Sequence, residues 1–78
     1  MTLKIYERLR KYRMDKGITQ VHIASKLKKP VQRLNAIELG RIKLTADEFE
    51  EICIKGLGIS PSIFFTDEFL ETKNNTTV

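Results

Sequence analysis

Residues 20–39, with the sequence QVHIASKLKKPVQRLNAIEL, contain two short amphipathic segments separated by a turn. In the first segment the apolar side chains are Ile23, Ala24 and Leu27, and their spacing is that of one face of a helix. The second segment has a polar face opposite its apolar one. Two short helices joined by a tight turn are the pattern of a helix-turn-helix, so this stretch makes double-stranded DNA the first candidate partner.

The apolar spacing along the whole chain predicts an all-α domain with five helices and no strand. The helices are expected over residues 3–16, after Thr19, over residues 30–39, from Thr45 to Leu57, and from residues 60–61 onward. In the fourth helix the apolar residues follow the i, i+3, i+4, i+7, i+8 pattern at Phe49, Ile52, Cys53, Gly56 and Leu57.

The residues at the expected helix ends favour these boundaries. Gly17 suits a left-handed end of the first helix, and Thr19 is a good N-cap for the second. Pro30 fits the first turn of the third helix, where its missing N–H costs nothing. Thr45 and Glu48 have the spacing of a capping box, in which each side chain bonds a backbone N–H of the other residue.

The length and composition of the chain predict one globular domain. It has 78 residues, of which 41% are hydrophobic and 31% charged. We assign residues 1–70 to the helix-turn-helix domain and residues 71–78 to a polar tail that we expect to be disordered. The single Cys53 excludes an internal disulfide, and the sequence shows neither a signal peptide nor an apolar run of membrane-spanning length. We therefore expect a cytoplasmic protein that does not bind membranes.

The charge is divided unevenly along the chain, although its net value is only +4. Residues 1–16 contain six basic and two acidic side chains, and residues 17–45 contain six basic side chains and the single acid Glu38. From residue 46 to residue 72 seven acids accompany one lysine. The first run alone is typical of a solvated face, but the near absence of acids over the helix-turn-helix favours a surface that faces phosphates.

Helical geometry separates two faces of the third helix. At 100° per residue, Pro30, Leu34 and Ile37 fall on a packing side, with Val31 and Arg33 on the flanks. The free side consists of Gln32, Asn35, Ala36 and Leu39. Amide side chains can bond adenine in the major groove, and small apolar groups can touch the thymine methyl. Taken alone, a Gln or Asn on a helix surface is equally consistent with simple solvation.

Three elements of the sequence resemble the Cro/cI-type helix-turn-helix domain, also called the XRE family, of phage repressors and small bacterial regulators. They are the GITQ of residues 17–20, then Ala24 and Leu27, and the IELG of residues 37–40. The resemblance covers about residues 5–65. It implies a five-helix, lambda-repressor-like fold and dimeric binding to palindromic operators, with residues 30–39 as the recognition helix.

The resemblance also implies roles for particular residues. The positions nearest the bases would be Val31, Gln32, Arg33 and Ala36, to which the helical geometry adds Asn35. A DNA phosphate would be held by Gln20, and the basic residues around the motif are expected to hold further phosphates at Lys29, Arg41, Lys43 and Arg13.

Arg13 and Glu38 occupy positions that often form an ion pair in the family. Glu38 lies at the border of the buried side of its helix, where an unpaired carboxylate would be costly. We therefore expect a structural ion pair between Arg13 and Glu38, which could also orient Arg13 toward a phosphate.

The sequence departs from the family pattern in three places. Lys28 stands where the turn usually has a Gly, so either a non-Gly residue adopts a positive φ at a cost of roughly 1 kcal/mol, or the turn is looser or the second helix longer by a residue. Val31 and Ala36 replace longer polar side chains, which leaves base reading mainly to Gln32, Arg33 and Asn35. Residues 52–59 are one residue longer than usual, and a bulge or extended turn near residues 56–58 is expected to absorb the difference.

The segment after Leu57 is unusually apolar for the end of a small domain. Its large apolar residues are Ile59, Ile63, Phe64, Phe65, Phe69 and Leu70. Ile59, Ile63 and one of the first two Phe residues are expected in the core, and the remainder would be covered by a second subunit or by the tail folding back. We predict a homodimer whose interface includes Phe64, Phe65, Phe69 and Leu70.

The sequence gives no sign of catalysis. His22 is the single histidine and is expected on an outward face, Cys53 belongs to an apolar stripe, and no cluster has metal-ligand spacing. We expect no cofactor, metal or small-molecule ligand.

Three functions are consistent with the sequence. We expect a bacterial or phage-encoded, nucleoid-associated repressor. A controller protein of a restriction-modification system is the second interpretation. The third is a protein-interaction module, such as an antitoxin or anti-repressor that has lost DNA binding.

Overall fold

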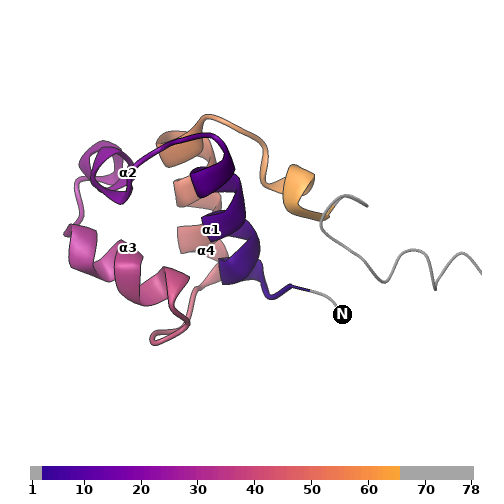
Figure 1. The fold of residues 1–78 in the computed structure, drawn as a ribbon, viewed down its shortest axis with the longest axis horizontal. Helices are drawn as coiled ribbons and strands as arrows, with labels where there is room; N and C mark the ends of the chain where they lie inside the picture. The colour runs from indigo at the N-terminus through magenta and orange to yellow at the C-terminus, as the bar shows by residue number, and fades with distance from the viewer. Residues whose placement is uncertain (1–2, 66–78) are drawn as a thin grey trace, which may run out of the picture.

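The computed structural model describes residues 3–65, which fold into a bundle of short helices (Figure 1). In chain order the helices are α1 (Ile5–Asp15), α2 (Gln20–Leu27), α3 (Val31–Glu38), α4 (Ala46–Glu51), a π-helix η1 (Ile52–Leu57) that continues α4, and a 3₁₀ helix η2 (Pro61–Phe65). No strand occurs within residues 3–65. The all-α prediction is confirmed, but the part of the chain described has four α-helices rather than five, because the last helix is a short 3₁₀ segment.

The hydrophobic core is assembled from every helix except α4. Its buried members are Leu9, Ile23, Leu27, Leu34, Ile37, Ile52, Cys53 and Phe64. α2 packs on α3 and on η1, while α1 packs on α3 and η2. Figure 1 shows α2 and α3 at one end of this body and η2 at the other. The core therefore fixes the helix-turn-helix at one end of the molecule.

The end of α1 and the start of α2 follow the predicted capping. Gly17 has φ +70°, the left-handed conformation predicted for it. The Thr19 hydroxyl accepts a hydrogen bond from the His22 N–H at 3.0 Å, so Thr19 is the N-cap of α2.

The turn between α2 and α3 is made without glycine. Lys28 adopts φ +57° and ψ +43°, and α2 ends at the preceding residue. Of the alternatives left by the sequence, the strained non-Gly turn is the one observed. Pro30 was expected in the first turn of the helix and on its packing side, and both expectations are wrong: it is the exposed N-cap residue, with ψ 140°, just before α3.

The fourth helix ends in the π-helix η1, which can hold the extra residue expected from the sequence. A π-helix holds one more residue per turn than an α-helix, so the insertion stays within the helix instead of lengthening the turn after it. Gly58, at φ +68°, then ends the helix, and the Ile59 N–H donates to the Cys53 carbonyl at 2.9 Å.

Gly56 lies where η1 approaches α2 most closely. A Cβ atom at this position would stand 2.8 Å from Cγ2 of Ile23, which is a core residue. The absence of a side chain is therefore what allows the two helices to approach this closely.

The capping box predicted at the start of α4 forms only on one side. The Thr45 hydroxyl accepts from the Glu48 N–H at 3.1 Å, as expected. The Glu48 carboxylate, however, accepts hydrogen bonds from Arg33 and Lys29 and not from the Thr45 N–H. The two cations offer this carboxylate stronger, charge-assisted hydrogen bonds than a backbone amide would.

Phe64 is a core residue, which corrects its assignment to a dimer interface. Its side chain is fully buried, with its ring 5.5 Å from that of Tyr12 and 5.8 Å from that of Phe49, in edge-to-face contact. Phe65 is 53% exposed. Of the other predicted interface residues, Phe69 and Leu70 lie outside the described residues.

Arg8 connects the two ends of the described chain. The buried guanidinium donates from Nε to the Leu3 carbonyl at 2.8 Å and from Nη1 to the Phe64 carbonyl at 3.1 Å, and it lies over the Phe65 ring. The sequence analysis assigned Arg8 only to a basic run. This contact fixes η2 against α1.

Candidate nucleic-acid interface

The exposed face of α3 has the composition expected from helical geometry. Leu34 and Ile37 are buried, whereas Gln32 and Asn35 are exposed. Between these faces Val31 and Ala36 are half-buried. The free side of α3 thus combines amides, which can bond base edges, with small apolar groups.

Gln20, the first residue of α2, is hydrogen-bonded to α3 next to this face. Its Nε2 donates to Glu38 Oε1 at 2.9 Å and to Asn35 Oδ1 at 3.3 Å. The second bond uses the acceptor of the Asn35 amide and leaves its nitrogen as a donor. Gln20 therefore orients Asn35 while linking α2 to α3.

Arg13 and Glu38 form a two-pronged ion pair between α1 and α3. Arg13 donates from Nε to Glu38 Oε2 at 2.7 Å and from Nη2 to Oε1 at 2.9 Å, and its Nη1 donates to the Ile18 carbonyl at 2.8 Å. The Glu38 side chain is 2% exposed and that of Arg13 12%. All three guanidinium nitrogens are thus engaged within the protein, and the pair holds α3 against α1.

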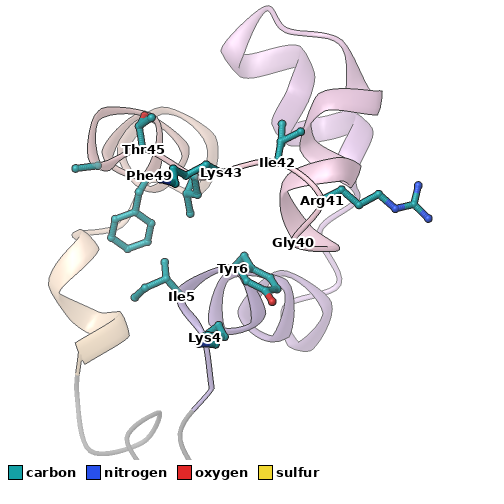
Figure 2. A pocket seen from close by; sticks show the side chains of 11 residues that line it. Lys4, Ile5, Tyr6, Gly40, Arg41, Ile42, Lys43, Thr45 and Phe49 are labelled. Atoms are coloured by element: carbon teal, nitrogen blue, oxygen red, sulfur yellow. The ribbon is translucent and has the colours of Figure 1, made fainter.

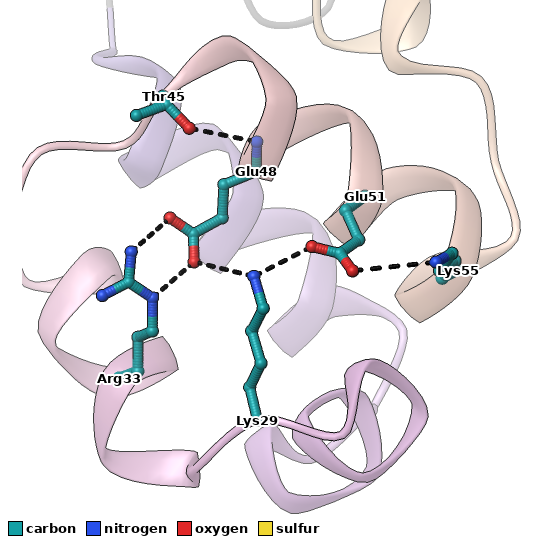
Figure 3. A network of polar contacts seen from close by, with 6 residues as sticks. All are labelled: Lys29, Arg33, Thr45, Glu48, Glu51 and Lys55. Atoms are coloured by element: carbon teal, nitrogen blue, oxygen red, sulfur yellow. Dashed lines mark hydrogen bonds and ion pairs between the residues drawn. The ribbon is translucent and has the colours of Figure 1, made fainter.

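A second polar network joins α3 to α4 (Figure 3). Arg33 donates from Nε to Glu48 Oε2 at 2.6 Å and from Nη2 to Oε1 at 2.7 Å. Lys29 reaches Glu48 at 3.4 Å and Glu51 at 2.9 Å, and Lys55 lies 3.8 Å from Glu51. The network thus contains two carboxylates and three cations.

The hydrogen bonds of this network shift the pKa values of Glu48, Glu51 and Lys29. Hydrogen bonding from Arg33 holds the pKa of Glu48 below its usual value although burial opposes the shift. The hydrogen bond from Lys29 lowers the pKa of Glu51, and the same bond raises the pKa of Lys29. These shifts favour the charged forms of Glu48, Glu51 and Lys29.

This network engages two residues that the sequence analysis placed on DNA. Lys29 was expected on a phosphate and Arg33 near the bases, whereas both are bonded to α4 in the structure. Nothing in the local sequence indicated this, because Arg33 and Glu48 are 15 positions apart and the spacing of Glu48 from Thr45 suggested a capping role. One feature of the sequence could have indicated the network: Glu48 and Glu51 are three residues apart, so both carboxylates lie on one face of their helix, where cations of another helix can pair with them.

Arg41 and Lys43 are exposed in the loop that follows α3. The loop begins at Gly40, at φ +74°, where a Cβ would come within 2.6 Å of the Tyr6 ring. Beside it lies an open hollow of about 610 Å³ lined by the start of α1, this loop and Phe49 of α4 (Figure 2). Figure 2 shows Arg41 extending away from the hollow. The loop that starts at this tight contact thus carries two exposed cations directly after α3.

Three exposed apolar side chains border a second hollow, of about 570 Å³, where α1, α2 and α3 meet. They are Met14, Val21 and Leu39, which are 56%, 64% and 46% exposed. Gln20 and Asn35 line the same hollow. The sequence analysis placed Leu39 on the free side of its helix but did not foresee this apolar cluster.

The described residues offer no metal site, and none of their helices has the length and apolar character needed to cross a membrane. Cys53 is fully buried, and burial raises the pKa of its thiol to about 12.

A short helix with an exposed polar face, fixed by a preceding helix and flanked by free cations, defines a helix-turn-helix DNA-binding domain. The chain belongs to the helix-turn-helix family of the XRE type, whose family model matches residues 9–64. It is therefore a DNA-binding transcription regulator of that type, and the family is not one of enzymes. Searches of curated proteins and of solved structures returned no match.

Proposed function

We propose that this regulator is a sequence-specific repressor of the phage or mobile-element type, which acts in the cytoplasm by occupying a palindromic operator as a homodimer. The observation that supports this proposal best is the exposed face of α3, where Gln32 and Asn35 are free of the core while Leu34 and Ile37 anchor the helix. A helix presented in this way fits the major groove.

In this proposal the residues divide into two groups. Base edges are contacted by Val31, Gln32, Asn35 and Ala36. Phosphates are contacted by Arg41 and Lys43. We leave out Gln20, Arg13, Lys29 and Arg33, because each is bonded to a carboxylate of the protein.

Two substitutions test the two groups separately. Gln32→Ala should relax the base preference at one position of each half-site, whereas Lys43→Ala should weaken binding to all sequences alike and reduce the salt slope by about 0.9 for each half-site. The measurement is the dissociation constant for a duplex from the chain's own upstream region and for single-base variants of it, at several salt concentrations. If neither substitution changes binding, α3 and its following loop are not the DNA-binding surface.

The dimer rests on the apolar segment at the end of the described chain. Phe65 is a large apolar residue that is 53% exposed, and Phe69 and Leu70 follow it in the sequence. Two copies related by a two-fold axis would place their recognition helices on half-sites about one helical turn, ~34 Å, apart. Sedimentation that finds only monomer, with and without operator DNA, would refute the dimer.

One observation favours a second candidate, a protein-interaction module. The exposed cluster of Met14, Val21 and Leu39 lies beside Gln20 and Asn35, and exposed apolar patches commonly bind proteins. DNA affinity that falls steeply with salt supports the repressor, and the absence of DNA binding supports the interaction module.

A further inference from the structure

We propose that Glu48 shapes the base preference of this regulator without touching DNA, by holding Arg33 against α4 and away from the bases. The inference rests on the proposed function, because it assumes that α3 reads the major groove. It concerns the one cationic side chain of α3, which would otherwise be the strongest candidate of this helix for bonding guanine.

The contact between the two residues has the geometry that holds a guanidinium most firmly. Both oxygens of the carboxylate are used, at 2.6 and 2.7 Å, in a parallel pair of charge-assisted hydrogen bonds (Figure 3). The same two nitrogens, Nε and Nη2, form an edge of the guanidinium that could grip a guanine or phosphate. Arg33 therefore cannot use this edge on DNA while it remains on Glu48.

Both the backbone and the side chain of Glu48 are held by hydrogen bonds. Its backbone N–H is bonded to the Thr45 hydroxyl, and its side chain is 6% exposed beneath Arg33 and Lys29. It also lies in the first turn of α4, where the helix favours a negative charge. If Arg33 left, the nearly buried carboxylate would keep only the Lys29 contact at 3.4 Å, and that loss opposes the transfer of Arg33 to DNA.

The two cations after α3 differ from Arg33 in that no carboxylate of the described residues holds them. Arg41 and Lys43 are exposed and make no ion pair within residues 3–65. They can bind phosphate without giving up a partner among the described residues. The structure thus divides the cations near the recognition helix into a free group and a restrained one.

The test compares Glu48→Gln with Glu50→Gln. Both remove one negative charge from α4, but Glu50 is exposed and lies outside the network, so the second variant controls for the change in net charge. Glu48→Gln should release Arg33. We expect it alone to gain a preference for guanine at one position of each half-site, or a salt slope steeper than that of Glu50→Gln by about 0.9 for each half-site. Either gain should vanish in the double variant Glu48→Gln/Arg33→Gln.

A measurement on the unmodified chain covers the case in which Glu48→Gln fails to fold. The NMR signal of the Arg33 Nε–H should keep its chemical shift and its slow exchange with water when a saturating operator duplex is added. A large shift on adding DNA means that Arg33 transfers to it, and the proposal is then wrong. It is equally wrong if the Gln variants of Glu48 and Glu50 bind alike, or if Arg33→Gln alone changes the base preference.

These outcomes are separable from those of the proposed function. If Gln32→Ala and Lys43→Ala weaken binding as expected while the two Gln variants behave alike, the repressor proposal stands and the role of Glu48 falls. If none of the four variants affects DNA binding, the recognition surface itself is wrongly assigned.

Discussion

Glu38 links α3 to the two helices that precede it. Its carboxylate accepts two bonds from Arg13 and one from Gln20, so that α1, α2 and α3 meet at one nearly buried group. A buried carboxylate of this kind is stable only while its donors remain in place. The orientation of α3, and with it the face proposed to contact DNA, therefore depends on these charged hydrogen bonds and not on apolar packing alone.

Arg13→Ala should lower the free energy of unfolding by about 3–5 kcal/mol, because it leaves the Glu38 carboxylate with the Gln20 amide as its donor. Urea denaturation monitored by circular dichroism measures this loss. Lys11→Ala is the matched control, since it removes a cation of the same helix whose pair with Asp15 is exposed, and it should cost less than about 1 kcal/mol. Equal losses in the two variants would contradict a structural role for the buried pair.

The Glu48 network predicts how stability depends on pH. Because the pKa of Glu48 is lowered in the folded chain, the unfolded chain binds its proton first as the pH falls. The stabilisation is fully present above the ordinary glutamate pKa of 4.5 and is lost as the pH falls through the lower value of the folded state. Urea unfolding between pH 3 and pH 7 should show a smaller decrease for Arg33→Gln than for the unmodified chain. An identical pH dependence would mean that Arg33 does not hold this carboxylate.

At the scale of single elements, the success of sequence reasoning depended on whether the decisive interactions were local. The N-cap at Thr19 and the left-handed Gly17 follow from neighbours within one turn, and both were predicted, while the left-handed Lys28 was one of the alternatives that the sequence left open. Glu48 was misassigned because a local partner, the Thr45 N–H, competes with Arg33 on another helix, and the sequence does not show which wins. For a similar reason the sequence could not distinguish Phe64 from Phe65, because adjacent residues of a short helix differ in burial only through their tertiary contacts.

Gly56→Ala tests the close packing of η1 on α2. The added Cβ would meet Ile23 Cγ2 at 2.8 Å, and neither helix can yield without disturbing the core, so we expect a loss of about 1–3 kcal/mol in the free energy of unfolding. Chemical denaturation provides the measurement. Ile23→Ala removes the opposing methyl group, so in the double variant the two losses should be less than additive. Strict additivity would show that the two positions are not in contact.

At the scale of the whole molecule, the two consecutive Phe residues of η2 should separate folding from assembly. Phe64→Ala empties a fully buried site and should cost about 3–5 kcal/mol of stability. Phe65→Ala removes a half-exposed ring that contacts Phe49 and Arg8, so it should cost much less stability than Phe64→Ala and weaken the proposed dimer. Thermal denaturation and sedimentation equilibrium distinguish the two effects. If Phe65→Ala leaves both the assembly and the affinity for operator DNA unchanged, this face of η2 is not the interface.

The π-helix η1 also has a consequence for comparing this chain with its relatives. Adding one residue to an α-helix would rotate everything downstream by about 100°, and Gly58, Ile59 and η2 would then leave the core in a different direction. The wider turn cancels that rotation, so the angular phase of the helix is restored before it ends. An alignment gap placed in the following loop would pair each η1 residue with the wrong counterpart. For the one-residue difference expected from the sequence, the gap belongs inside the helix, between residues 52 and 57.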